Sequence, residues 1–262
     1  MSLSAADLLS LLSGGIVGFT LGLVGGGGSI LAVPLLVHVV GVPSAHVAIG
    51  TSAVAVAASA AANLVGHARA RHVKWPCATV FALFGIVGAA GGAALGKMVD
   101  GGRLLSMFGL LMVVIGLLML CPRRSAGDAK VRLSIDSAPR LLPLLAGFGF
   151  GVGLLSGFFG IGGGFLIVPG LIAATAMPLI NAIGSSLVAV TAFGSTTAAS
   201  YAVSGLVDWR IATVFVIGGA AGGLIGIWSS ARLAAYKHVL SLLFATVVIS
   251  VGVYVTTAAL LT

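Results

Sequence analysis

The sequence predicts an all-α polytopic membrane protein built from two inverted repeats, each with a glycine-broken pair of short helices and three transmembrane helices. Three observations support this prediction: the composition, an internal duplication, and the distribution of charge among the loops. Of the 262 residues, 59% are hydrophobic and 7% are charged, and the mean hydropathy is +1.23. A soluble domain carries charge on about a quarter of its residues, whereas apolar runs of about 20 residues suit a bilayer. The composition therefore predicts a chain whose surface faces lipid.

The duplication is visible as short blocks that recur in the same order about 135 residues apart. Gly25–Pro34 and Gly160–Pro169 both read G-x-G-G-x-x-L-x-V-P, and Ile49–Val56 matches Ile183–Val190 at six of eight positions. Chance matches in apolar sequence do not preserve order and spacing, so the chain contains one unit twice. Two further blocks continue the match: Val73-Lys74-Trp75 with Val207-Asp208-Trp209, and Gly85, Gly88 and Gly92 with Gly219, Gly222 and Gly226.

The duplication divides the chain into a first transmembrane repeat at 1–121, a polar cytoplasmic linker at 122–140, and a second transmembrane repeat at 141–262. Each repeat is predicted to contain five apolar segments. In the first repeat they cover about 8–24, 29–41, 45–66, 76–97 and 103–121, and in the second about 141–159, 163–177, 181–204, 210–231 and 236–260.

The second segment of each repeat is too short to cross a bilayer as a straight helix. It follows a glycine run and carries a proline, Pro34 or Pro169. The first two segments of each repeat therefore form a broken pair, either a re-entrant hairpin or two half-spanning helices.

Loop charges predict the orientation of the repeats through the excess of Lys and Arg on the cytoplasmic side. The loop at 67–74 is basic and is predicted to lie inside, together with the linker. Because successive spans alternate in direction, the loop around Lys97–Arg103 is then outside. In the second repeat Arg232 and Lys237 are predicted to lie inside, which places the Asp208 loop outside. Equivalent loops thus face opposite sides, so the repeats are predicted to be inverted, with a substrate site at their interface near the midplane.

The glycine runs are candidate anion sites. Consecutive glycines bring backbone N–H groups close to a ligand, and the short helix predicted after each run adds unpaired amides and a positive dipole end. The alternative is that glycines only permit close helix packing; this alternative is favoured for the regularly spaced glycines at 85–96 and 219–226. The candidate residues are Gly26, Gly27, Gly28 and Ser29 in the first repeat and Gly162, Gly163 and Gly164 in the second.

Hydroxyl groups form the second candidate set: Thr51 and Ser52 in the first repeat, Ser185 and Ser186 in the second. A hydroxyl can donate to an oxyanion or cap a helix start, and the alternative is that it bonds back to its own helix. Both interpretations stay open for these four residues.

Other classes of function are disfavoured by what the predicted spans lack. The five acidic residues are all Asp and fall at helix ends or in connectors, which disfavours a metal-ion carrier and predicts neither a metal site nor a cofactor. An intramembrane enzyme would need a nucleophile and a base at membrane depth, and no such pair is evident, so we expect no enzyme activity. The net charge of +8 is spread over several loops, which disfavours nucleic-acid binding.

Together, the doubled glycine block, the I-G-[TS]-S block and the V-x-W block make the chain similar to the sulfite exporter (TauE/SafE) family over roughly residues 14–255. The resemblance, which extends to 4-toluene sulfonate uptake permeases, implies a multi-pass transporter of the bacterial inner membrane whose substrate is a small sulfur oxyanion or organosulfonate. Export is the expected direction, because a negative charge leaving a cell that is negative inside gains about 2.3 kcal/mol per 100 mV. An anion channel is the alternative, the lipid bilayer is the expected environment, and a homodimer stays open.

Overall fold

A computed structural model of the chain describes residues 5–120, 138–160, 164–232 and 237–261, and over these ranges it is entirely helical. The all-α prediction is therefore confirmed. In the described part of the chain, seven helices are long and apolar enough to cross a membrane. The elements are α1 (Ala5–Val24), the 3₁₀ helix η1 (Gly25–Leu31), α2 (Ala32–Pro34), the π-helix η2 (Leu35–Val39), α3 (Ala45–Arg69), α4 (Trp75–Gly96), α5 (Gly101–Leu120), α6 (Ala138–Phe159), α7 (Gly164–Thr175), α8 (Leu179–Val203), α9 (Trp209–Arg232) and α10 (Lys237–Leu261).

The predicted linker lies mostly outside the described residues. Its last three positions, 138–140, already belong to α6. The other predicted segments match the observed helices to within a few residues, because long apolar runs bounded by polar or proline-containing loops define both ends of a membrane helix. Local caps add to this, for example at Ser44, whose hydroxyl accepts from the amide of Val47 at the start of α3.

The first glycine run differs from the prediction in detail. We expected a new helix to begin at Ser29, but Gly25–Leu31 continues directly from α1 as a 3₁₀ helix. Glycine tolerates the tighter winding because it has no Cβ. After Pro34 the winding loosens into η2, and the amide of Val40 donates to the carbonyl of Leu35. Pro34 cannot donate a backbone hydrogen bond, which favours such irregular winding around it.

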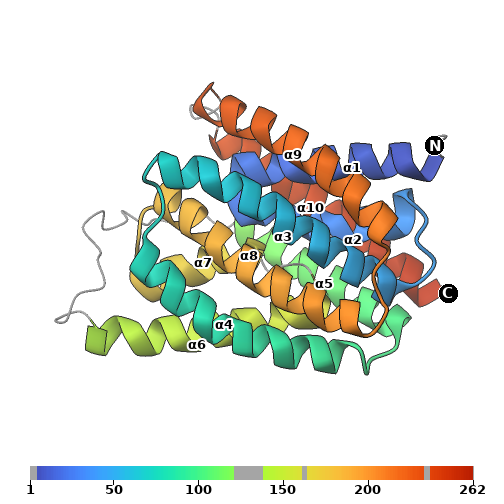
Figure 1. Cartoon of the computed structure of the whole chain (residues 1–262), viewed down its shortest axis with the longest axis horizontal. Coiled ribbons are helices and arrows are strands. Elements are labelled where there is room, and N and C mark those ends of the chain that lie inside the picture. Colours follow the sequence, from blue (N-terminus) through green and yellow to red (C-terminus); the bar gives the residue numbers. More distant parts are fainter. Residues whose placement is uncertain (1–4, 121–137, 161–163, 233–236, 262) are drawn as a thin grey trace.

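Each broken pair folds back on itself. In Figure 1, α1 runs from the right of the view to the left and the η1–α2–η2 segment returns to the right, whereas α6 runs left to right and α7 returns to the left. A close contact marks the first return: a Cβ placed on Gly28 would overlap the backbone of Thr20 and Leu21 in α1. Both broken pairs therefore have the form of hairpins. The prediction of two short helices in each pair is wrong for the first member, because α1 and α6 are each long enough to cross a membrane.

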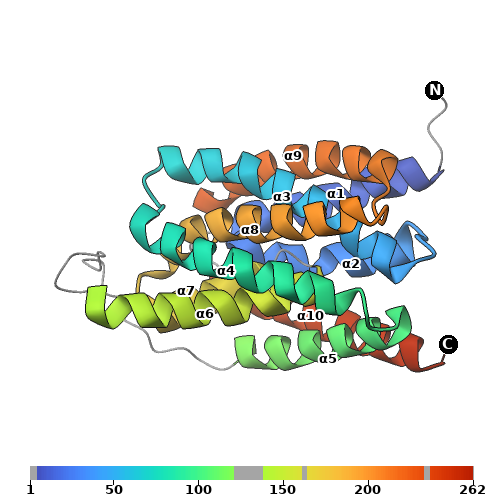
Figure 2. The ribbon, with the colours of Figure 1, turned by 60° about the horizontal axis from the view of Figure 1, so that its bottom comes forward.

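Helix packing follows the same pattern in both halves of the chain. α4 packs along α6 and α9 packs along α1, while α3 packs against α8 and α5 against α10. Figures 1 and 2 show α1 with α9 on one face and α4 with α6 on the opposite face, with α3, α8 and the hairpins between them. This arrangement surrounds the two hairpins with helices from both halves.

Glycines make the α4–α6 and α1–α9 contacts close. A Cβ on Gly88 would overlap the carbonyl of Phe150, and a Cβ on Gly222, the matching glycine, would overlap that of Gly15. The packing interpretation of the regularly spaced glycines is thus confirmed, since only hydrogen at these Cα atoms allows the backbones to approach so closely.

The loops divide between two ends of the molecule. Figure 1 shows the 70–74 loop and the start of α6 at the left, which we call the linker end, and both chain termini at the right, which we call the terminal end. The loops at 97–100 and 204–208 also lie at the terminal end. There Arg210, at the start of α9, forms an ion pair of 2.7 Å with the buried Asp7 of α1.

Candidate functional site

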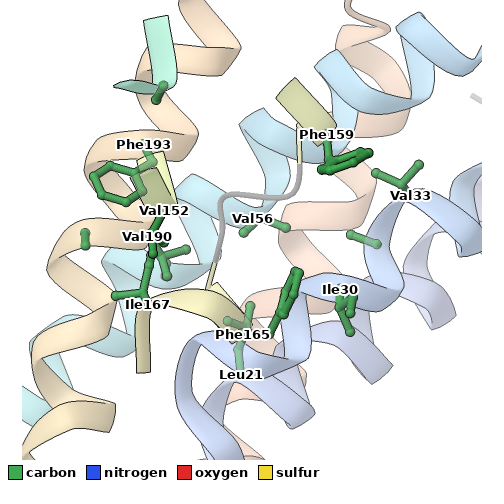
Figure 3. Packing of buried hydrophobic residues seen from close by; sticks show 14 of the residues in the cluster. Leu21, Ile30, Val33, Val56, Val152, Phe159, Phe165, Ile167, Val190 and Phe193 are labelled. Atoms are coloured by element: carbon green, nitrogen blue, oxygen red, sulfur yellow. The ribbon is translucent and has the colours of Figure 1, made fainter. Parts of the chain in front are cut away.

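The two hairpins meet in the middle of the bundle. η1 packs against α7 and α8, and α7 packs against α6 and α8. Figure 3 shows Ile30 of η1 and Phe165 of α7 within one buried cluster, together with Leu21 and Phe159. The structure therefore brings the segments that follow the two glycine runs side by side, in an apolar setting.

Ser52 connects α3 to the second glycine run. Its fully buried hydroxyl lies 2.8 Å from the carbonyl of Ile49 and 3.3 Å from the carbonyl of Gly160. Gly160 has a φ of +66°, and a Cβ there would overlap the side chain of Ile49. A glycine is thus required at this position for both conformation and space.

Ser186 makes the matching bond in the second half, donating to the carbonyl of Ile183 at 2.7 Å. Of the two interpretations left open for the hydroxyls, bonding to the same helix is the one seen for both Ser52 and Ser186. A bond of this kind holds the hydroxyl oxygen at a fixed position, from which its lone pairs can still accept.

Thr51 and Ser185 hold loops of the opposite repeat. The hydroxyl of Thr51 accepts from the amide of Asp208 at 3.0 Å, and the hydroxyl of Ser185 accepts from the amide of Lys74 at 2.9 Å. Asp208 and Lys74 directly precede α9 and α4, so each hydroxyl satisfies an amide at the start of a helix. The two loops lie at opposite ends of the molecule (Figure 1), so the structure does not gather the predicted hydroxyls at one point.

Some of the glycines predicted to bind the anion lie among the described residues and some do not. Gly26 and Gly27 lie within η1, and Gly28 and Ser29 are buried there. Gly164 is buried and is the first described residue of α7, the short helix predicted after the second glycine run. Gly162 and Gly163 lie outside the described residues.

Charged side chains are located away from this centre. The two segments that meet there, η1 and α7, contain no Asp, Glu, Lys or Arg. The polar groups of these segments are backbone amides and hydroxyls, and α6, which packs against α7, carries Ser156, whose buried hydroxyl has no partner among the described residues. Such a site offers hydrogen-bond donors and dipoles without a buried cation.

Ser156 was not among the residues predicted from the sequence. Its equivalent in the first repeat, 135 positions earlier, is the apolar Leu21. A polar residue at a position where the duplicate has an apolar one could have marked Ser156 as a candidate.

The model of the family described as "Sulfite exporter TauE/SafE" matches residues 10–255. The chain belongs to the TauE/SafE family. Among curated relatives, the "Probable membrane transporter protein" of Xylella fastidiosa (strain 9a5c) is 54% identical over 243 residues, covering 93% of this chain and 92% of the relative. The "Probable membrane transporter protein YunE" of Bacillus subtilis (strain 168) is 29% identical over 230 residues, covering 81% and 84%. No solved structure matches this chain.

TauE/SafE membership and the seven apolar helices make this a multi-pass membrane transporter, as expected for the bacterial inner membrane. The family was predicted from the doubled glycine block, and that prediction is confirmed. The relatives' names specify a membrane transporter and do not specify a substrate.

The hydroxyls of Thr51 and Ser185 should contribute to stability. Thr51→Val or Ser185→Ala leaves the amide of Asp208 or Lys74 without its acceptor, and we expect each to lower the free energy of unfolding by about 1–2 kcal/mol. The two effects should add to within about 0.5 kcal/mol because the sites are far apart. Thermal unfolding of purified single and double variants measures both quantities. The control is Thr257→Val on exposed α10 surface, and equal losses in control and test variants would contradict the assigned role.

Proposed function

We propose that this TauE/SafE transporter moves a small sulfur oxyanion or organosulfonate, such as sulfite or a sulfonate, out of the cell as a secondary transporter. The observation that supports it most is the apposition of the two glycine-containing hairpins inside a bundle whose centre has polar groups but no charged side chain. A singly or doubly charged oxyanion suits such a site, because backbone amides bind it without desolvating a buried cation.

In this proposal the anion contacts the amides at the start of α7, beside which η1 packs. Gly164 begins α7, and the first amides of a helix have no partner within it and lie at the positive end of the helix dipole. Ser156 would add a hydroxyl donor from α6, since its hydroxyl has no partner in the described part of the chain. The helix-start amides and this hydroxyl together form a neutral cradle for an anion.

We further propose that residues 1–121 and 141–262 are inverted repeats and that the linker end is cytoplasmic. Matching helices run in opposite directions in Figure 1, for example α3 with α8 and α4 with α9. Ten of the thirteen Lys and Arg residues belong either to the linker end or to the 121–137 segment between α5 and α6. The positive-inside rule predicts such an excess on a cytoplasmic face. The ten residues are Arg69, Arg71, Lys74, Arg123, Arg124, Lys130, Arg132, Arg140, Arg232 and Lys237.

The orientation predicts opposite labelling of two equivalent loops. In a background without Cys77 and Cys121, Asp208→Cys should react with a membrane-impermeant thiol reagent added from the periplasm, and Arg71→Cys should react only after the membrane is permeabilised. Equal labelling of both positions in intact cells would contradict the inverted arrangement and favour parallel repeats.

The substrate is tested by reconstitution. Proteoliposomes containing the purified protein should carry at least one of sulfite, sulfate, sulfoacetate and taurine faster than a small carboxylate, with a rate that saturates. Failure to carry any sulfur oxyanion or organosulfonate would overturn the proposal. A reversal potential that follows the anion gradient alone, with currents beyond transporter turnover, would instead indicate an anion channel.

A further inference from the structure

The end of α3 forms a backbone motif that brings two histidines together. Arg71 adopts a left-handed conformation with a φ of 56°, the amide of Arg71 donates to the carbonyl of Ala68, and the amide of His72 donates to the carbonyl of His67. This is the Schellman arrangement, in which the residue after the left-handed position contacts the residue five positions earlier. Here the contacting residues are His72 and His67, with ring centroids 5.7 Å apart.

The second repeat contains the same motif with different side chains. At the end of α8, Gly205 is left-handed with a φ of 70°, and the amide of Leu206 donates to the carbonyl of Tyr201. Glycine at the left-handed position and an aromatic–aliphatic contact are the usual form of this motif. The fold is therefore satisfied by Tyr201 and Leu206 at positions where the first repeat has two imidazoles.

The imidazoles carry unused hydrogen-bonding capacity in a buried place. His67 is 8% exposed, and neither of its ring nitrogens has a partner among the described residues. The buried Nδ1 of His72 has none either. Buried polar groups in proteins are nearly always paired with protein, water or a ligand, so these three nitrogens in adjacent rings are available to bind water or a ligand.

The surroundings select an anion over a cation. Residues 67–74 include Arg69, Arg71 and Lys74 and no acidic residue, which disfavours a metal ion and attracts an anion. The loop is held to the start of α8 by two bonds: the amide of Lys74 donates to Ser185, and the side-chain amide of Asn181 donates to the carbonyl of His72. The two rings thus lie at the junction of the repeats, at the linker end.

We propose that His67 and His72 form a second oxyanion-binding site, at the linker-end mouth of the transport path, where an N–H donor from each ring binds the oxygens of a sulfite or sulfonate group. This assignment rests on the proposed function for the identity of the anion and deepens it by adding an entry site distinct from the central glycine hairpins. An imidazole offers one N–H donor when neutral and two when protonated, so either state can serve.

The direct test is titration of the purified full-length protein, labelled with ¹⁵N-histidine, with sodium sulfite and separately with methanesulfonate at constant ionic strength. We expect saturable shifts of the ring nitrogens of His67 and His72, and not of His46 at the terminal end. The double variant His67→Tyr with His72→Leu copies the pair that the second repeat uses at this place, so it should fold and should lose at least tenfold in the affinity of this site. His72→Leu alone, at the more exposed ring, should lose part of that affinity.

Several outcomes would overturn the assignment. Unchanged His67 and His72 signals with both anions would mean that the rings are paired by water alone, and shifts with Zn²⁺ but with neither anion would indicate a metal site instead. Transport separates this inference from the proposed function. If the wild-type protein carries sulfite and the double variant does so with an unchanged apparent affinity from the linker end, the entry site is wrong and the transporter proposal stands. If neither protein carries any sulfur anion while the rings still shift, the binding site stands without the proposed function.

Discussion

Gly153→Ala in α6 should prevent this protein from folding normally, whereas Gly151→Ala two residues away should be tolerated. A Cβ on Gly153 would overlap the backbone of Gly85 in α4, but a Cβ on Gly151 would meet nothing within 4 Å. Overpacking against flexible side chains costs about 1–3 kcal/mol, and we expect the upper end of this range or more here because backbone atoms cannot move aside. Yield of monodisperse protein and thermal unfolding of the two variants measure the difference.

The matching position in the other half provides a second comparison. Gly18 of α1 faces the backbone of Gly219 in α9 in the same way that Gly153 faces Gly85. Gly18→Ala should therefore be about as damaging as Gly153→Ala. Normal yield and an unfolding temperature close to wild type for both variants would contradict the backbone-to-backbone contact on which the packing of α1 with α9 and α4 with α6 depends.

The second large effect concerns the central site. If amides of the second glycine run bind the anion, a Cβ at Gly163 should obstruct the ligand or exclude the required backbone conformation. Losing one hydrogen bond to a charged ligand costs about 1.5–3 kcal/mol, which corresponds to about ten- to a hundredfold in affinity. Binding of sulfite or methanesulfonate to purified, monodisperse Gly163→Ala protein gives this number directly.

The controls separate recognition from folding. Gly151→Ala, on α6 with open space around it, should leave the affinity unchanged. Gly28→Ala is unsuitable as a test of anion binding. The added Cβ would overlap the backbone of Thr20 and Leu21, so a loss of affinity in this variant could come from disturbed packing of the hairpin. An unchanged affinity in Gly163→Ala would reject the amide site, and Ser156, whose hydroxyl has no partner among the described residues, would be the next residue to replace.

The hairpins show where local sequence was sufficient and where it was not. A glycine run followed by a short apolar segment with Pro34 or Pro169 predicted a broken pair, and both pairs turn back on themselves. The winding of Gly25–Leu31 as a 3₁₀ helix was not predictable. Glycine permits many conformations at similar energy, and the one adopted is selected by the packing of Gly28 on α1 and of η1 on α7.

By itself the sequence determined the membrane class, the duplication, the TauE/SafE family and the approximate ends of the helices. Apolar length, repeated blocks and loop charges are properties of the chain that do not depend on its tertiary contacts. Only the tertiary structure decided the roles of particular polar residues. Thr51 bonds to a residue 157 positions away and Ser185 to one 111 positions away, and the burial of Ser156 and His67 is seen only in the folded chain. A hydroxyl or an imidazole has the same chemistry wherever it lies, so whether it caps a helix, bonds to its own helix or is left to bind an anion depends on which distant groups the fold places beside it.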